Sequence, residues 1–446
     1  MTKEMKSSDE RWVYSIPPSW RVEPLKHHCS MFKGLPILKT DLVEEGVPVI
    51  SYGQIHSKDN TGTHLDESLL RFIPASMLAG DESSKLRKGD VVFADTSEDV
   101  EGIGNAALID TDGVVYAGYH TVICRPNQSS LSGRFFAYLA RTDAWRYQLR
   151  NLAMGVKVFS ITQAILRRSE VLLPPLDEQE RIADFLDERC AVLDVAVKLI
   201  CKQITNLEFY RHSIIHETVT QGLNPNVTMK PSGVEWIGNI PSNWRVSRLR
   251  YLASFESGAT PSKDSLEFWA GTIPWVSSQE VKEDILLDTS LHITSAAISS
   301  CSTRILPEGT LVMVVRSGIL QHTIPVALLG RPMTINQDIK ALQFNCEMLS
   351  KYFLYLVKGN NDNLLKALIK DKSTVDNINF EYLLSLSVPV PSIDEQESIV
   401  SYLDRRCSVV DAVLETKRKQ LEVLKKKRQS LIYEYVTGKR RVSKER

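Results

Sequence analysis

Residues 12–22 read W-V-Y-S-I-P-P-S-W-R-V, and residues 236–246 read W-I-G-N-I-P-S-N-W-R-V. A second repeated block follows in the same order: residues 174–180 read P-P-L-D-E-Q-E, and residues 391–397 read P-S-I-D-E-Q-E. Because chance does not reproduce both the order and the spacing of two blocks, the chain contains an internal duplication. Its period is far longer than the roughly 20–50 residues of solenoid repeats. We therefore expect two similar halves related by a pseudo-twofold axis.

Between these blocks the two halves diverge. L-R-K-G-D-V-V-F from Leu86 only loosely matches L-P-E-G-T-L-V-M from Leu306. Short apolar runs that end in turn residues predict strands at residues 91–93, 114–116 and 310–315. Aromatic and leucine spacings of three to four predict helices at residues 134–149 and 349–369. Each half is thus expected to hold a mixed α/β interior within a repeated frame.

The repeated P-x-x-D-E-Q-E block predicts the start of a long helix in each half. Asp177 with Glu180, and Asp394 with Glu397, have the spacing of a helix-capping box. Further along, apolar residues recur every seven positions, which is typical of a coiled-coil seam. The seam residues are Leu186, Leu193, Ile200, Leu207, Ile214, Leu403, Val410, Leu424 and Leu431.

These helices are too long to pack on one small domain. Residues 177–214 alone would extend roughly 57 Å as a helix. The expected fold is mixed α/β, with two globular domains separated by two long antiparallel coiled-coil helices. The alternative is that each helix packs only on its own domain.

The composition excludes several functional classes. Lys and Arg together number 54, as do Asp and Glu, so overall charge does not drive binding to polyanions. A basic run at residues 417–428 is either a solvated helix face or a stripe that faces phosphates. The seven cysteines have no C-x-x-C spacing, and no apolar stretch approaches the about 20 residues that span a bilayer. These features predict a reduced cytoplasmic protein without a membrane partner.

Catalytic motifs are missing from the sequence. It contains no phosphate-binding loop, no G-x-G-x-x-G, no N-P-P-Y or D-P-P-Y and no H-E-x-x-H. The carboxylate pairs at residues 177–178 and 394–395 are explained by helix starts rather than by acid–base or metal chemistry. We therefore expect a chain that is not an enzyme and that holds no metal or cofactor.

Polar residues on turn-rich stretches are the candidates for a binding site. Amide, hydroxyl and cationic side chains on loops are what reading base edges of DNA requires, although any polar loop has a similar composition. The DNA-binding candidates are Tyr52, Gln54, Lys58, Lys157, Ser160, Ser278, Gln279, Arg316, Ser317, Gln337 and Lys372.

Taken together, four features resemble the specificity subunits of type I restriction–modification systems, which act in phage defence. They are the W-x-x-x-I-P-x-x-W-R opening, its repetition in mid-chain, the P-x-x-D-E-Q-E helix starts, and the closing V-T-Q-G and V-T-G. The resemblance implies that each interior is a target-recognition domain that reads one half of a bipartite sequence in double-stranded DNA. It implies that the helices set the half-site spacing and dock modification subunits.

The resemblance also places catalysis on partner subunits. It implies no cofactor in this chain, with S-adenosylmethionine, ATP and Mg²⁺ on the modification and restriction subunits. Target-recognition domains are expected at residues 1–174 and 223–391, helical spacers at 175–222 and 392–438, and a basic tail at 439–446. Two alternatives are a coiled-coil interaction scaffold that does not read DNA and an enzyme that acts alone.

Overall fold

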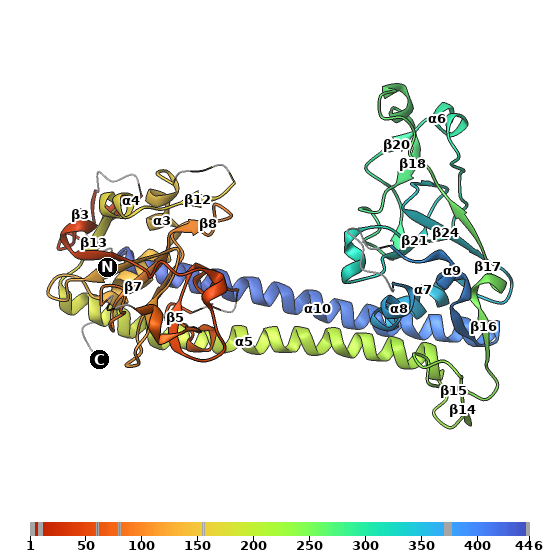
Figure 1. The fold of residues 1–446 in the computed structure, drawn as a ribbon, viewed down its shortest axis with the longest axis horizontal. Helices are drawn as coiled ribbons and strands as arrows, with labels where there is room; N and C mark the ends of the chain where they lie inside the picture. The colour runs from red at the N-terminus through yellow and green to blue at the C-terminus, as the bar shows by residue number, and fades with distance from the viewer. Residues whose placement is uncertain are drawn as a thin grey trace. The chain divides into compact units, whose positions relative to one another are not determined.

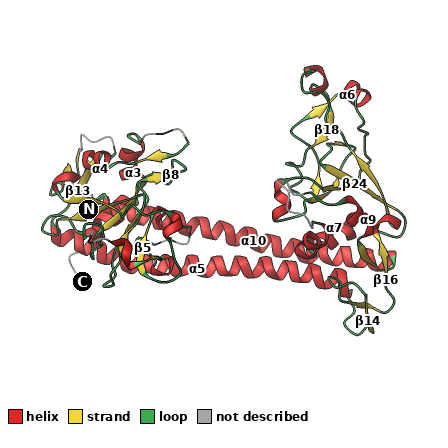
Figure 2. Cartoon of the chain, viewed as in Figure 1, coloured by secondary structure: helices red, strands yellow, loops and turns green. Residues whose placement is uncertain are grey.

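The computed structural model describes residues 5–7, 12–58, 60, 62–78, 80, 82–153, 155, 157–369 and 377–442. The chain forms two compact units. Unit 1 comprises residues 1–202 and 419–446, and unit 2 comprises residues 203–418. Both units combine strands with helices (Figure 2), so the predicted mixed α/β class is confirmed.

Unit 1 is built around a sheet of order β4-β11-β7-β9, with all neighbours antiparallel. Its strands are β4 (Cys29–Lys33), β7 (Val91–Ala94), β9 (Ala106–Leu108) and β11 (Thr121–Pro126). The smaller sheets comprise β5 (Val47–Ile50), β6 (Arg71–Ile73) and β10 (Tyr116–Ala117); β3 (Arg21–Pro24) with β13 (Glu170–Leu173); β8 (Thr96–Ser97) with β12 (Phe159–Ser160); and β1 (Lys6–Ser7) with β2 (Ser15–Ile16). The short helices are α1 (Tyr52–Ile55), α2 (Gly133–Ala140), α3 (Asp143–Arg150) and α4 (Gln163–Arg168).

Unit 2 repeats this plan with a sheet of order β17-β24-β21-β22-β19. Its strands are β17 (Ala253–Ser257), β19 (Ile285–Leu286), β21 (Leu311–Val314), β22 (Val326–Leu329) and β24 (Ile339–Phe344). The smaller sheets comprise β18 (Ile273–Val276), β20 (His292–Ile293) and β23 (Thr334–Ile335); β16 (Arg245–Arg248) with β25 (Ser387–Val390); and β14 (Met229–Pro231) with β15 (Asn239–Pro241). The short helices are α6 (Ser295–Ser300), α7 (Ser350–Gly359), α8 (Asn361–Leu368) and α9 (Phe380–Ser385).

The two long helices are α5 (Leu176–Gln221) and α10 (Ile393–Val436), and each contributes to both units. Within each unit the parts of α5 and α10 that belong to it lie side by side (Figure 1). In unit 2, Arg418 bonds Glu208 and Arg211 bonds Asp411, so the helices run antiparallel. In unit 1, Arg428 bonds Asp194 and Tyr435 packs on Phe185, so the helices run antiparallel there too. The coiled-coil prediction is therefore confirmed.

The predicted seam residues lie on the inner faces of these helices. Leu186, Leu403 and Val410 are buried, and the other predicted seam residues are partly buried. The seam does not stop at the helix pair, because the ends of the helices enter the domain cores. Ile432 and Val436 of α10 are buried in the unit 1 core. The alternative in which each helix packs only on its own domain is therefore wrong.

The predicted capping boxes are misplaced. Leu176 and Ile393 are already helical, so Asp177, Glu180, Asp394 and Glu397 lie within the first turns. The cap of α10 is Ser392, whose Oγ accepts a hydrogen bond from Glu395 N at 3.3 Å. The α5 start uses the Pro175 carbonyl oxygen, which accepts from Glu178 N at 2.8 Å. The carboxylates still favour these helix starts through the helix dipole.

Two other helix predictions are corrected by polar residues that interrupt them. Residues 134–149 form α2 and α3, because Thr142 Oγ1 accepts from Trp145 N at 3.2 Å and caps a new helix. Residues 349–369 form α7 and α8, with Asn360 between them. The predicted strand at 114–116 is shifted to Tyr116–Ala117, whereas the strands at 91–93 and 310–315 are found as β7 and β21.

The repeated D-E-Q-E block fastens each long helix to its interior. Gln179 is fully buried; its Oε1 accepts from Ser132 N, and its Nε2 donates to the carbonyl oxygens of Ser130 and Pro174. Gln396 makes the matching bonds to Leu349 N, Glu347 O and Pro391 O. The glutamine of the motif therefore has a structural role in both halves.

The tryptophan motif that opens each half packs against the C-terminal end of a long helix. Gly222 and Gly438 both have a φ of +75°, the left-handed conformation that ends a helix. Trp20 lies against Gly438 in unit 1, and Trp244 lies against Gly222 in unit 2. The four motif tryptophans are largely buried or partly buried, as expected for packing anchors. Among the described residues, no helix is both long and apolar enough to cross a membrane.

Candidate nucleic-acid interface

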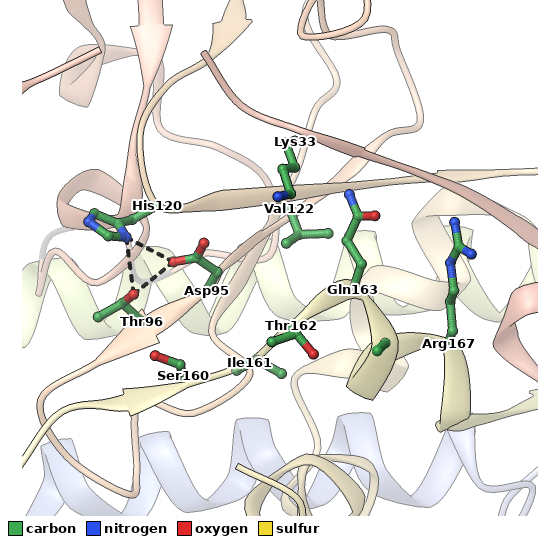
Figure 3. Close-up of a pocket in the computed structure, with 11 residues that line it drawn as sticks. Lys33, Asp95, Thr96, His120, Val122, Ser160, Ile161, Thr162, Gln163 and Arg167 are labelled. Atoms are coloured by element: carbon green, nitrogen blue, oxygen red, sulfur yellow. Dashed lines mark hydrogen bonds and ion pairs between the residues drawn. The ribbon is translucent and has the colours of Figure 1, made fainter. Parts of the chain in front are cut away.

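A cavity of about 630 Å³ opens in unit 1 and is lined by residues from β4, β8, β11, β12 and α4 (Figure 3). Most of its lining residues are polar or charged: Lys33, Asp95, Thr96, His120, Ser160, Thr162, Gln163 and Arg167. Gln163 and Arg167 project from α4 in the same direction (Figure 3), as residues four apart on a helix do. We name this cavity pocket A.

His120 is held firmly at the rim of pocket A. Its Nδ1 lies 3.1 Å from Asp95 Oδ1 and 3.2 Å from Thr96 Oγ1, and Thr96 Oγ1 donates to Asp95 Oδ1 at 2.7 Å (Figure 3). His120 has a φ of 55°, a left-handed conformation that is uncommon outside glycine. Such backbone strain is typical of residues whose position matters to function. With Nδ1 bonded, the other ring nitrogen of the exposed side chain is available for a ligand.

Aromatic rings extend this polar surface. The Tyr52 ring packs edge to face on His120, Tyr119 and His56, with centroid distances of 5.4, 5.6 and 6.2 Å. Burial, together with neighbouring Tyr52, raises the pKa of Tyr119 above its ordinary value, so its phenol stays neutral. A cluster of half-buried aromatic rings beside polar groups is suited to contact with nucleic-acid bases.

A second cavity, pocket B, has a volume of about 420 Å³ and lies in unit 2. Its polar lining residues are Arg316, Gln337, Lys340, Asn377, Asn379 and Glu381. Arg316 Nε donates to Asp338 Oδ1 at 2.7 Å. Lys340 Nζ lies 4.7 Å from the centre of the Phe380 ring. Pocket B therefore presents several cationic and amide donors.

Pockets A and B occupy the same place in the repeated frame. In unit 1, Asp95 N donates to His120 O at 3.0 Å, and Ile161 N donates to Asp95 O at 2.7 Å. In unit 2, Val315 N donates to Asp338 O at 2.8 Å, and Ile378 N donates to Val315 O at 2.9 Å. The register of β7 with β11 matches that of β21 with β24. The backbone around the two pockets is thus held by the same hydrogen bonds.

The side chains presented by this common frame differ. Thr96 corresponds to Arg316, His120 to Asp338, Val122 to Lys340, Ser160 to Asn377, and Gln163 to Phe380. The backbone is the same in both units, but the side chains at matching positions differ. Some hydrogen-bond donors in one unit are acceptors in the other, and some polar groups are replaced by apolar ones. Such an arrangement can present different recognition chemistry in each unit without altering the fold.

A third cavity, pocket C, of about 680 Å³ lies in unit 2 beside α5 and α7. It is lined by Ser278, Gln279 and Ser317, among others, and by the ion pair of Lys358 with Asp284. Ser317 Oγ also accepts from Ile319 N at 3.5 Å, which starts a short 3-10 helix. Ser317 thus has a local structural role as well.

The structure places the sequence candidates in different environments. Ser160 lines pocket A, Arg316 and Gln337 line pocket B, and Ser278, Gln279 and Ser317 line pocket C. Tyr52 is part of the aromatic cluster, and Gln54 Oε1 accepts from Ser51 N at 2.9 Å, which gives it a structural bond. Lys58 and Lys157 are exposed on loops, outside the residues that line the three pockets. Lys372 lies outside the described residues.

Sequence reasoning missed several residues that the structure brings together. Asp95, His120 and Gln163 are distant in sequence and line pocket A together. In unit 2, pairing of β21 with β24 brings Asp338 and Lys340 beside Arg316. One signal was available. Extending the loose match between the segments at Leu86 and Leu306 by a few residues aligns Thr96 with Arg316.

Known proteins match both halves of the chain. The family described as "Type I restriction modification DNA specificity domain" matches residues 29–195 and 241–424. The chain is 31% identical over 210 residues to the EcoR124I/EcoR124II specificity subunit of Escherichia coli, covering 47% of this chain and 48% of the relative. A second relative, the MjaIX specificity subunit of Methanocaldococcus jannaschii, is 31% identical over 193 residues. The chain thus spans under half the length of each of these two curated relatives.

Two other comparisons extend over nearly the whole chain. The putative MjaX specificity subunit of Methanocaldococcus jannaschii is 22% identical over 434 residues, covering 96% of both chains. A solved structure titled as a study of complex assembly and conformational transition of the type I R-M system has a TM-score of 0.68 at 20% identity. It covers 95% of this chain and 99% of its own, and it supports the fold. With both interiors matched, the chain belongs to the type I restriction–modification DNA specificity family.

Proposed function

We propose that this chain is the DNA-recognition subunit of a type I restriction–modification complex, that each unit reads one half of a bipartite sequence in double-stranded DNA, and that the chain itself has no catalytic activity. The relatives support the general assignment, since their names describe specificity subunits. S-adenosylmethionine, ATP and Mg²⁺ would then act on the modification and restriction subunits.

One observation carries the proposal: pockets A and B have the same backbone hydrogen bonds but different side chains. An enzyme's repeated site would keep its reacting groups, whereas a pair of reading sites has to differ to read different half-sites. Both pockets offer imidazole, guanidinium, ammonium or amide groups, which are the groups that bond base edges. The relation between the pockets therefore favours recognition over catalysis.

The long helices supply a surface for partner subunits. Val192, Val195 and Leu199 are exposed on α5 with spacings of three and four residues, so they share one helix face. At the repeated position on α10, Val409 is 61% exposed, compared with 66% for Val192, and Val413 is exposed one turn later. Exposed apolar residues aligned on a helix are typical of a protein contact. We infer that modification subunits dock here, one at each repeated patch.

A charge placed in each patch tests the docking. Val192→Lys and Val409→Lys should each weaken binding of one modification subunit, and the double variant should prevent assembly, as measured by size-exclusion chromatography with light scattering. Leu266→Lys is the matched control, because Leu266 is exposed but lies outside the long helices. Normal assembly of the double variant would contradict docking at these patches.

The reading function is tested by sequencing the methylated bases of cells that express this chain with its neighbouring modification gene. Cells with the modification gene alone are the control. The expected result is a bipartite N6-methyladenine motif that depends on this chain. If both proteins are soluble and associated and no motif arises, the chain is an interaction scaffold, and the reading function is wrong.

A further inference from the structure

Arg316 in pocket B is fixed by a carboxylate rather than left as a mobile cation. Its Nε and Nη2 each lie 2.7 Å from Asp338 Oδ1. Asp338 is itself fixed, because its Oδ2 accepts from Asn336 Nδ2 at 3.2 Å and its backbone N donates to Asn336 Oδ1 at 3.1 Å. Asn336 is buried. A buried residue thus holds Asp338, and Asp338 holds the guanidinium of Arg316.

The guanidinium keeps further N–H donors for a ligand. A guanidinium carries five, and the contact with Asp338 uses those of Nε and Nη2 that face the carboxylate. Half of the Arg316 side chain is exposed, at 54%, so the remaining donors are accessible to a ligand. Two parallel donors on a rigid plane match the two acceptors, O6 and N7, on the major-groove edge of guanine.

The neighbouring groups agree with a ligand that accepts hydrogen bonds. Gln337 Oε1 accepts from Thr260 Oγ1 at 2.6 Å, so the carbonyl end of this amide is already bonded. Lys340 on β24 adds a positive charge to the lining of pocket B. Pocket B also contains the Glu381 carboxylate, so the preference for an accepting ligand rests on the remaining N–H donors of Arg316.

A phosphate is a poorer partner for Arg316. The contact with Asp338 forms a pair without net charge, and the carboxylate would repel a phosphate brought to the same guanidinium. Hydrogen bonds to a neutral base edge depend on the direction of the N–H donors rather than on net charge. Base reading is therefore compatible with a guanidinium held in an ion pair. The Asp338 contact therefore favours base reading over backbone binding.

Unit 1 presents different chemistry at the matching position. Thr96, which corresponds to Arg316, uses its hydroxyl hydrogen for Asp95. His120 takes the place of Asp338. Unit 1 therefore lacks a guanidinium at this position of the frame, and the two half-sites should differ in the base read there.

We propose that Arg316 reads a guanine in the half-site bound by unit 2, with Asp338 as its positioning residue. This inference rests on the proposed function, since it names the base that one of the two reading sites takes. It follows from the placement of a fixed guanidinium in a pocket whose backbone frame is shared with pocket A.

The test replaces Arg316 with lysine, which keeps the positive charge but not the paired donors. Complexes of this chain with the modification subunit are assayed for methylation of duplexes in which one base pair at a time is changed. Arg316→Lys should lower discrimination at one guanine by roughly 5- to 150-fold and leave the other half-site unchanged. Asp338→Asn should relax the same position to a smaller extent.

Arg331→Lys is the matched control, because Arg331 is 48% exposed and faces Asp288 at 3.9 Å outside pocket B. It should retain the wild-type motif. An assembled Arg316→Lys complex with unchanged specificity would overturn the inference. So would a uniform loss of binding to every sequence together with a weaker salt dependence, which indicates a phosphate contact. If either of these results is found while the wild-type complex still produces a bipartite methylation motif, the proposed function stands and only this inference fails.

Discussion

Arg428 on α10 and Asp194 on α5 form a two-contact ion pair, with Nε to Oδ1 at 2.7 Å and Nη2 to Oδ2 at 3.3 Å. The repeat provides the same pair in unit 2, where Arg211 and Asp411 are joined at 2.8 and 3.2 Å. The roles of the two helices are exchanged between the pairs, since the arginine lies on α10 in unit 1 and on α5 in unit 2. These pairs fix the register of the antiparallel helices.

The two pairs should differ in their effect on stability because they differ in exposure. The side chains of Arg428 and Asp194 are 12% and 24% exposed, compared with 23% and 50% for Arg211 and Asp411. We expect Arg428→Ala to lower the free energy of unfolding by about 3 kcal/mol, because it leaves a largely desolvated carboxylate unpaired. Arg211→Ala should cost about 1 kcal/mol. Urea denaturation followed by circular dichroism measures both values, and an equal or larger cost for Arg211→Ala would contradict this ranking.

The buried glutamines of the D-E-Q-E motif should be essential for the fold. Gln179→Leu leaves Ser132 N and the carbonyl oxygens of Ser130 and Pro174 without their partner. The expected loss is about 3 kcal/mol of unfolding free energy, since each unsatisfied buried group is costly. Gln203→Leu, at an exposed position of α5, is the control and should change stability little. Similar melting temperatures for the two variants would show that the motif glutamine is dispensable.

Asp187 should make unit 1 sensitive to acid. Burial alone would raise the pKa of Asp187, but hydrogen bonds from His64, Tyr138 and Arg134 outweigh it and lower this pKa to about 2 from an ordinary value of 3.8. A group with a lowered folded-state pKa stabilises the fold above its unfolded pKa and loses that contribution as the pH falls through the folded value. The contribution, on the order of 2 kcal/mol, should therefore disappear between about pH 4 and pH 2.

Asp187→Asn should remove this pH dependence. Denaturation of the wild type and of the variant at intervals between pH 5 and pH 2 gives the difference in unfolding free energy. That difference should shrink as the pH is lowered. The control is Asp112→Asn, since Asp112 is exposed on the surface of unit 1. A difference that stays constant over the whole range would show that Asp187 is not the acid-sensitive group.

His120 should affect the half-site read by unit 1, whereas Arg316 should affect the half-site read by unit 2. We choose His120→Asn because asparagine tolerates the left-handed backbone at this position, so the fold should be retained while the ring is lost. The methylation motif should change only in the half-site read by unit 1. Base-resolved methylation of duplex libraries measures this change. A change in both half-sites, or in neither, would argue against independent reading by pockets A and B.

Local patterns in the sequence predicted the helices well and the pockets less well. The heptad spacing identifies inward residues such as Leu186 and Leu403 because helix periodicity is a local property. The capping-box pattern predicts Asp394 as the cap of α10, whereas Ser392 caps the helix. The polar, turn-rich sequence around Arg316 and Gln337 predicts a binding site, and the structure places both residues in pocket B.

Their partners could not be found in this way. Asp338 meets Arg316, and His120 meets Asp95, only because antiparallel strands bring the end of one beside the start of another. Register between strands depends on the packing of the whole sheet and not on neighbouring residues. The repeat makes some of these residues predictable, because a functional residue found in one half indicates the corresponding residue in the other half.

The contribution of α10 to the core of unit 1 bears on how the chain folds during synthesis. Unit 2 is one continuous segment, whereas unit 1 needs residues 419–446 to complete its core around Ile432 and Val436. A ribosome therefore finishes every residue of unit 2 while the first interior still lacks part of its apolar lining. During that interval the nascent first interior is open to aggregation and to proteases. The yield of folded protein should then depend on translation speed and chaperone supply, and a late stop codon should damage the N-terminal unit first.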